Sequence, residues 1–175
     1  MLEGKLVNLK VMDKEDIPLF SEWNDNPEFF GEFEWYLQRS RAEREKIYDA
    51  LPPDTKRFFI EKKDGTRIGY IIHFLTGSLF EIGYALVPNE RGKGYCTEAV
   101  KIFFDYLFLS KDLARIQAQT HVKNVASQKV LEKVGFKKEG IMRKALFVRG
   151  KWADQTLYSI LREEWKEPRI LAKTA

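Results

Sequence analysis

The chain has 175 residues and a mass of 20.6 kDa, with 44% hydrophobic and 32% charged residues. This apolar content can fill one hydrophobic core, which excludes an intrinsically disordered chain and favours a single domain over residues 1–175. The net charge of +4 is too mild to indicate a stable nucleic-acid partner, and no apolar run approaches the roughly 20 residues that a membrane span requires.

The first half of the chain predicts two helices and an antiparallel meander. Asp13 is a plausible helix N-cap, and the apolar residues after it recur at helical spacing. Asp64-Gly65 is typical of a tight turn between two strands. The expected elements are a strand over residues 6–11, a helix from Asp13 that ends at the turn 24–27, a helix over 40–51, and strands over 57–61, 68–74 and 80–87.

The second half alternates between helices and strands, which predicts at least one parallel crossover. We therefore expect an α/β fold: a mixed, mostly antiparallel sheet of about 6–7 strands with about four helices. Residues 167–175 lose periodicity and are expected to fray. The expected elements are a loop over 88–94, helices over 97–109 and 124–134, and strands over 115–120, 141–148 and 152–161.

The loop after residue 87 contains the most informative pattern in the chain. Gly92 and Gly94 remove side chains where backbone amides converge, just before a helix whose first N–H groups lack partners. This arrangement favours phosphate oxygens, and Arg91 and Lys93 add positive charge. The P-loop triplet is absent, and Thr97 breaks the dinucleotide-binding pattern. A tight surface turn without a ligand is the alternative.

Two motifs resemble those of the GCN5-related N-acetyltransferases. Arg91-x-x-Gly94-x-Cys96 is similar to their pyrophosphate-binding motif, Arg/Gln-x-x-Gly-x-Gly/Ala. Asn124-x-x-Ser127, followed by Leu-Glu-Lys-Val-Gly-Phe, resembles the branch that acetylates the N-termini of ribosomal proteins. The resemblance spans about residues 6–165 and implies that family's fold, with the parallel strands split at the acetyl-CoA site.

The resemblance implies an enzyme that transfers an acetyl group from acetyl-CoA directly to a primary amine, without a metal. The acceptor would be a protein N-terminus, a polyamine, an antibiotic or another small amine. A backbone N–H near Leu86 would stabilise the thioester oxygen. The residues expected to contact the cofactor are Ala85, Leu86, Val87, Arg91, Gly92, Lys93, Gly94, Tyr95, Cys96, Thr97, Asn124 and Ser127.

Two side chains are candidates for proton transfer. Glu81, on the strand before the loop, is the candidate base for the ammonium group of the acceptor. Many family members supply a Tyr as the acid, but Leu131 stands at that position, so Ser127 is the substitute. The alternatives are structural. Glu81 would be an outward-facing strand residue, Asn124 the N-cap of a helix and Ser127 a residue of that helix's first turn.

An aromatic segment between the first two helices is the candidate acceptor site. Phe33, Trp35 and Tyr36 alternate with acidic residues, which suits a cationic amine through cation–π and charge attraction. The alternative is that these rings roof the core. Exposed aromatics in the last hairpin, such as Phe147, Trp152 and Tyr158, would suit a homodimer, and they would equally suit the core.

Cys96 is a departure from the family motif and is the chain's one cysteine. A buried cysteine behaves as a small hydrophobic residue, so we expect cofactor binding to tolerate it. A nucleophilic Cys96 and a non-catalytic acyl-CoA-binding protein are the alternatives. One cysteine excludes an internal disulfide and, with two histidines, makes a zinc site unfavourable, so we expect a cytoplasmic protein.

Overall fold

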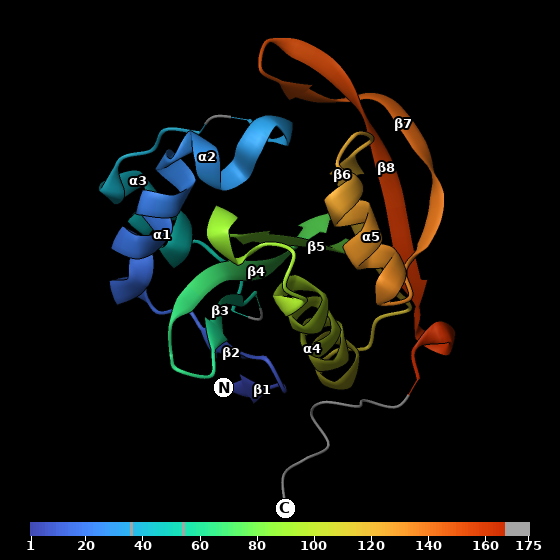
Figure 1. Ribbon diagram of the computed structural model, residues 1–175, viewed down its shortest axis with the longest axis horizontal. Helices are drawn as coiled ribbons and strands as arrows, with labels where there is room; N and C mark the ends of the chain where they lie inside the picture. The colour runs from blue at the N-terminus through green and yellow to red at the C-terminus, as the bar shows by residue number, and fades with distance from the viewer. Residues whose placement is uncertain (36, 54, 167–175) are drawn as a thin grey trace, which may run out of the picture.

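The computed structural model of the chain describes residues 1–35, 37–53 and 55–166. Within these residues, eight strands form one sheet in the order β1-β2-β3-β4-β5-β6-β8-β7, and five α-helices pack on it (Figure 1). The strands are β1 Leu2–Glu3, β2 Val7–Val11, β3 Arg57–Lys62, β4 Arg67–Thr76, β5 Leu79–Leu86, β6 Arg115–His121, β7 Lys137–Val148 and β8 Lys151–Leu161. The helices are α1 Ile17–Asp25, α2 Pro27–Phe30, α3 Arg41–Asp49, α4 Tyr95–Ser110 and α5 Val125–Lys133.

The sheet is antiparallel except between β5 and β6, which confirms the predicted mixed sheet. In the described chain these two parallel strands pair through Phe80–Ile116 and Glu81–Gln117 and then part. The connection between them is α4, because parallel neighbours require a crossover. The sheet is therefore opened at the carboxyl end of β5, next to the start of α4.

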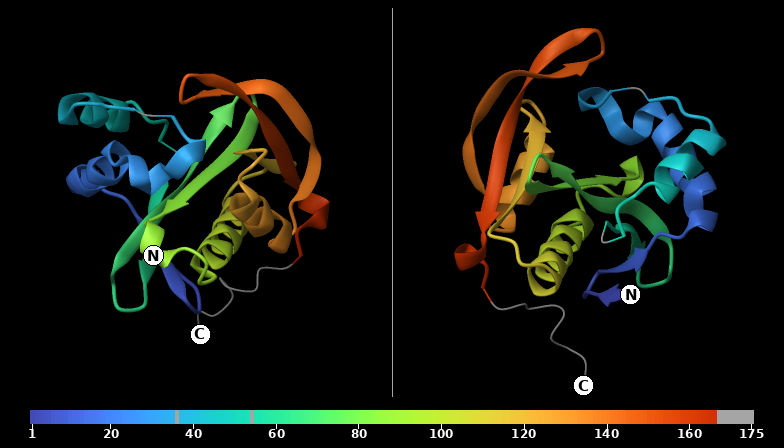
Figure 2. Two further views of the ribbon diagram at one scale, coloured as in Figure 1. Left: turned by 45° about the horizontal axis from the view of Figure 1, so that its top comes forward. Right: turned by 180° about the vertical axis from the view of Figure 1, so that it is seen from behind.

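The two faces of the sheet carry separate groups of helices, as Figure 2 shows. On β5, Ile82 and Leu86 belong to the main core beneath α4 and α5. Ala85, of the opposite parity, packs in a second core with residues of α1 and α2. This alternation follows from the period of two in a strand, and it gives β5 one face toward each group of helices.

One helix more than expected forms at the turn over residues 24–27. The N–H of Asn26 donates to the carbonyl of Trp23 at 3.2 Å, which ends α1. Its side-chain Oδ1 accepts the N–H of Glu28 at 2.9 Å, and Pro27 occupies the first position of α2. The residues that stop one helix thus also start the next, so the expected count of four was too low.

The sheet also differs from expectation at its two edges. β1 contains two residues, which is too short for a hydrophobic pattern, and it raises the strand count to eight. β7 begins at Lys137 rather than at residue 141. In the final hairpin, Phe147 and Trp152 are exposed, whereas Tyr158 is fully buried. No helix in the described residues is long and apolar enough to cross a membrane.

Gly69 allows β4 to approach β5 where the sheet begins to open. A Cβ at this position would collide with the carbonyl oxygen of Ala85 and lie 2.9 Å from the Cα of Leu86. Both neighbours are backbone atoms of a central strand, so they cannot turn aside as a flexible side chain would. Position 69 therefore requires glycine, because a side chain does not fit there.

Gly69→Ala should lower the free energy of unfolding by about 1–3 kcal/mol, because overpacking forces the backbone of β5 to shift. Urea unfolding followed by circular dichroism measures this change. Gly140→Ala is the matched control, since a Cβ on Gly140 in β7 meets no atom within 4 Å. We expect it to change stability by no more than about 0.5 kcal/mol. Equal effects at the two glycines would contradict the proposed close approach.

Candidate active site

The opened end of β5 presents backbone donors toward β6. The N–H of Val87 donates to the carbonyl of Ile68 at 2.8 Å. Because backbone groups alternate in direction along an antiparallel pair, the odd-numbered residues of β5 bond to β4. The N–H groups of Tyr84 and Leu86 therefore face the gap, beyond the last residue that pairs with β6. Of the three strand residues expected to contact the cofactor, Leu86 alone turns its N–H to this side.

The loop between β5 and α4 carries a second row of free donors. Gly92 and Gly94 adopt the left-handed conformation, with φ of 78° and 85°, and α4 begins at Tyr95. Within the described chain, the N–H groups of residues 92–97 donate to no protein acceptor. The next N–H, that of Glu98, bonds to the carbonyl of Gly94 at 3.1 Å. These amides, at the positive end of a sixteen-residue helix, fit the phosphate oxygens of a pyrophosphate.

The two basic side chains of this loop are engaged elsewhere, contrary to expectation. Arg91 donates from Nε to the carbonyl of Leu86 at 3.0 Å and from Nη2 to the carbonyl of Phe29. It thereby ties the loop to β5 and α2. Lys93 pairs with Glu90 at 2.9 Å. The anion-binding character of the loop consequently comes from its backbone and not from these two charges.

The first turn of α5 lies against the face of β5 that carries Tyr84. Asn124 caps the helix, as the structural interpretation expected, because its Oδ1 accepts the N–H of Ser127 at 3.1 Å. The hydroxyl of Tyr84 lies 3.0 Å from Oγ of Ser127 and donates to its carbonyl at 3.3 Å. Burial raises the pKa of Tyr84 well above its ordinary value, so this phenol stays protonated at neutral pH. Leu131, at the expected tyrosine position, is fully buried in the core.

Sequence reasoning missed Tyr84 as a neighbour of Ser127. The signal that reveals it is the alternation along β5, which places Tyr84 on the same face as Leu86 and Ile82. Those residues pack beneath α4 and α5, so a polar group at residue 84 is directed toward the first turn of α5. Its partner is 43 residues away and is not visible from local spacing.

Glu81 lies where β5 and β6 part, and it is 6% exposed. The interpretation of an outward-facing strand residue is therefore wrong. Its Oε2 accepts hydrogen bonds from Thr76 Oγ1 at 3.1 Å and from Nε2 of Gln117 and Gln119, each at 2.9 Å. Its Oε1 accepts none from the described residues. The three donors fix the carboxylate and leave one oxygen available for a proton.

The end of β6 meets the segment that was expected to bind the acceptor. The ring of Phe33 packs on His121 with centroids 4.9 Å apart. Arg149, at the turn between β7 and β8, donates to the carbonyl of Gly31 at 2.9 Å. Trp35 is 46% exposed, and Tyr36 lies outside the described residues. The N-terminal helices and the last hairpin thus meet over the opening, on the face that carries Glu81.

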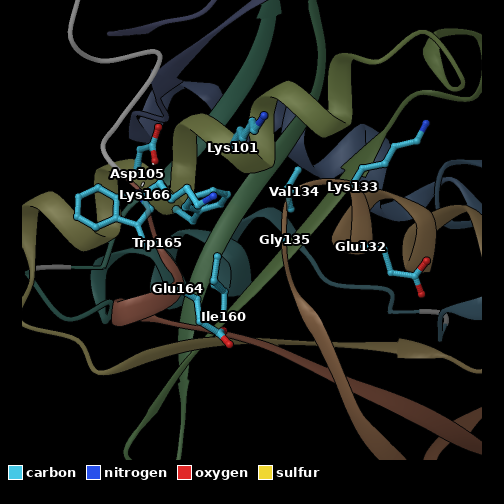
Figure 3. Close-up of a pocket in the computed structure, with 11 residues that line it drawn as sticks. Lys101, Asp105, Glu132, Lys133, Val134, Gly135, Ile160, Glu164, Trp165 and Lys166 are labelled. Carbon is cyan, nitrogen blue, oxygen red and sulfur yellow. Dashed lines mark hydrogen bonds between the residues drawn. The ribbon is translucent and has the colours of Figure 1, made fainter.

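A cavity of about 350 Å³ lies elsewhere, between α4, α5 and the end of β8 (Figure 3). It contains none of the residues expected to bind the cofactor or to transfer protons. Asp105 in its wall accepts a hydrogen bond from Trp165 Nε1 at 2.7 Å. Within the described residues, no three His, Cys, Asp or Glu side chains are placed to hold a metal ion. The opened strand pair is therefore the candidate active site.

Comparison with known proteins places this geometry in a family. The family model described as Acetyltransferase (GNAT) domain matches residues 7–137. The Probable N-acetyltransferase YjcK of Bacillus subtilis is 34% identical over an alignment that covers 92% of this chain and 97% of the relative.

Solved structures of the same fold include enzymes that act on two kinds of amine. The Ribosomal-protein-S5-alanine Acetyltransferase of Vibrio fischeri is 26% identical, with a TM-score of 0.79 over 94% of this chain and 97% of that one. The spermidine N-acetyltransferase of Vibrio cholerae, solved with CoA and spermine, is 22% identical, with a TM-score of 0.80 over 91% and 97%.

The single cysteine allows a direct test of its role in the site. Burial raises the pKa of the Cys96 thiol to about 12. At pH 8 the thiolate fraction should then be about three orders of magnitude below that of an ordinary cysteine, and it should rise continuously with pH up to that value. Iodoacetamide should alkylate Cys96 at least about 100-fold more slowly than N-acetylcysteine at pH 8. A rate that equals the model thiol and levels off near pH 9 would support a nucleophile instead.

Proposed function

The chain belongs to the GNAT acetyltransferase family, and from that premise we propose that it transfers the acetyl group of acetyl-CoA directly to a primary amine in a ternary complex. This proposal rests on two sets of backbone N–H groups that lie at the same opening and donate to no acceptor in the described residues. One set is the amides of residues 92–97, and the other is the N–H groups of Tyr84 and Leu86. Together they match a ligand with a pyrophosphate at one end and an amide-rich arm at the other.

The loop and β5 would share the binding of acetyl-CoA. The amides of residues 92–97 hold the pyrophosphate, and the gap-facing N–H groups of β5 align the arm as an added strand would. The backbone N–H of Leu86 or Tyr84 then stabilises negative charge that develops on the thioester oxygen. Holding both reactants in place contributes much of the rate, since the encounter becomes effectively unimolecular.

Glu81 is proposed as the base that accepts the proton of the attacking ammonium group. Along β5, Tyr84 lies about 10 Å from Glu81, at about 3.3 Å per residue. The proton therefore reaches the free Oε1 through ordered water rather than by direct contact. Gln117 and Gln119 act as positioning residues, because each holds Oε2 at 2.9 Å.

Tyr84 and Ser127 are proposed to protonate the departing thiolate. Their hydroxyls lie 3.0 Å apart on the face of β5 opposite Glu81. The raised pKa of Tyr84 keeps its hydroxyl protonated at neutral pH, so it can donate a hydrogen bond to the departing sulfur. The hydroxyl pair occupies the role that a tyrosine at position 131 fills in many family members. The cap formed by Asn124 fixes Ser127, so the structural role of Asn124 serves the chemical one.

The acceptor is proposed to enter where the N-terminal helices and the last hairpin meet, at Phe33 and Trp35. Relatives of the same fold are named for a ribosomal-protein alanine and for spermidine, so a protein N-terminus and a small amine are both candidates. The organised carboxylate of Glu81 favours an enzyme over a non-catalytic acyl-CoA-binding protein. A sensor would have no use for a buried base at this position.

Calorimetric titration with acetyl-CoA tests the proposed cofactor. We expect binding in the micromolar range for acetyl-CoA and none for ATP, because the site fits a pyrophosphate joined to an amide-bearing arm. A thiol-release assay with N-terminal peptides and polyamines then tests for turnover. Absence of heat with acetyl-CoA at millimolar concentration would contradict the proposed function.

Glu81→Gln tests the proposed base. We expect kcat/KM to fall by about 10²–10⁴-fold, since the amide keeps the shape of the side chain but accepts no proton. The affinity for acetyl-CoA should stay within about twofold, because Glu81 lies on the face away from Tyr84 and Ser127. A rise of activity at high pH in the variant would agree with this role, since less of the amine then needs deprotonation. Near-normal kcat/KM at neutral pH would remove Glu81 from the mechanism.

A further inference from the structure

A second cavity, of about 160 Å³, lies between the N-terminal helices and the sheet. Its floor is formed by β3 and β4, and its walls by α1, α3 and the segments beside them. It is large enough for one small polar group with a few carbon atoms. The polar residues that line it are Asn24, Arg39, Arg44, Tyr48, Arg57 and Tyr70.

The lining contains three arginines and no carboxylate. Arg44 is 6% exposed and pairs with Asp25 through Nη2, while its buried Nε has no hydrogen-bond partner in the described residues. Arg57 forms no ion pair with a described residue, and its guanidinium lies 5.5 Å from the centroid of the Phe20 ring. A buried donor and a partly buried charge without a counterion are both costly.

The three guanidinium groups act on one another. Burial and then the nearby charges of Arg39 and Arg44 lower the pKa of Arg57. Arginine remains protonated under these conditions, and because Arg44 is paired with Asp25, the cavity keeps the positive charges of Arg39 and Arg57. Planar guanidinium groups bind carboxylate and phosphate with paired hydrogen bonds. The chemistry of the cavity therefore selects an anion.

The tyrosine hydroxyls that line the cavity already donate hydrogen bonds to other groups of the protein. Tyr48 donates to the carbonyl of Met12 at 3.0 Å, and Tyr70 donates to Oδ1 of Asn24 at 3.3 Å. The amide of Asn24 donates to the carbonyl of Phe20 at 2.6 Å. What remains for a ligand is the set of guanidinium donors, in particular Nε of Arg44.

The sheet register places this cavity beside the candidate base. Arg57 pairs with Ile72, and Ile72 pairs with Gly83. Directly paired residues point to the same face, so these side chains share the face that carries Glu81. Ile72 and Glu81 are diagonal neighbours, about 7–8 Å apart. From Arg57, two strands away, Glu81 lies roughly 10–12 Å off.

We infer that the arginine cavity binds a carboxylate or phosphate carried by the acceptor itself, while the acceptor's amine points to Glu81. This inference rests on the proposed function and narrows its substrate class. The acceptor is then an amine whose anionic group lies roughly 10 Å away. An extended peptide spans that distance in about three residues, at 3.3–3.6 Å each. A polyamine carries positive charge at both ends and is disfavoured by the same cavity.

Glu34 is a second carboxyl group near the cavity, in addition to Asp25, which pairs with Arg44. Burial raises the pKa of Glu34 to about 7. Glu34 also contributes, after burial, to the raised pKa of Tyr70 in the cavity wall. The carboxyl of Glu34 thus lies beside the cavity rather than within its lining. In the described residues Glu34 forms no ion pair with Arg39 or Arg57, and its carboxyl group, which is partly ionised at neutral pH, can attract the amine of the acceptor.

Two matched pairs of acceptors test the inference in the thiol-release assay. The first pair is a peptide with Glu at its third residue and the same peptide with Gln there. The second pair is 8-aminooctanoate and 8-aminooctanamide. We expect kcat/KM to be about tenfold or more higher for the charged member, as hydrogen bonds to charged groups allow. A higher kcat/KM for the charged member of the first pair alone identifies a peptide acceptor. The same result in the second pair alone identifies a small amine. Either result supports the inference.

Variants of the arginines give the structural control. Arg57→Gln and the more exposed Arg39→Gln should reduce the preference to about twofold or less, with acetyl-CoA affinity unchanged. Arg41→Gln is the matched control, since Arg41 pairs with Glu45 on α3 and lies outside the cavity. It should keep the full preference. Circular dichroism and the urea midpoint show whether each variant is folded.

Failure of this inference is distinguishable from failure of the proposed function. Equal kcat/KM for both members of each pair, or a best rate with spermidine, would overturn the anionic acceptor and leave the transferase intact. Weakened acetyl-CoA binding in Arg57→Gln would overturn it too, by assigning the cavity to the cofactor. If no amine is turned over, calorimetry decides. Binding of 8-aminooctanoate to the wild type and not to Arg57→Gln would support the cavity, and no binding to either would refute it.

Discussion

The site depends on one constraint, which is that β5 and β6 run parallel but stay paired for two residues before they part. A parallel pair requires a crossover helix, so α4 begins beside the end of β5. The parting leaves the N–H groups of Tyr84 and Leu86 without a strand partner, next to the free amides of residues 92–97. Backbone donors of this kind must find water or a ligand. The proposed binding site is therefore made of main-chain atoms, whereas the side chains of Arg91 and Lys93 are engaged with other protein groups.

The period of two along β5 separates the two proposed proton transfers. Glu81 points to the face of the N-terminal helices, where the acceptor is proposed to enter. Tyr84 points to the face of α5, where the departing thiolate would need a proton. A residue shift of one in this strand would exchange the faces. The close approach of β4 at Gly69 and the hydrogen bond from Val87 to Ile68 fix that register. The contacts that stabilise the sheet therefore also determine on which face each proposed catalytic side chain lies.

Much of this arrangement could be predicted from the sequence, because it rests on local patterns. The glycines of the loop, the cap at Asn124 and the mixed sheet follow from spacing and residue type. The partners of Arg91, which are the carbonyls of Leu86 and Phe29, could not be predicted, since they depend on how α2 packs against β5. The glutamines that hold Glu81 are more than thirty residues from it and carry no local signal. Short elements such as α2 are difficult to predict, because the residues that start them also end the preceding helix.

The mild net charge of +4 conceals a polarity within the face that carries Glu81. Three arginines, one of them on α3, line the cavity, whereas Glu81 lies where β5 and β6 part. Such a face discriminates between ligands by the order of their charges and not by their sum. A ligand with an amine at one end and an anion at the other matches it in one direction, and that direction brings the amine to the opened strands. Separation of charge along one sheet face can thus supply both affinity for the acceptor and its orientation for attack.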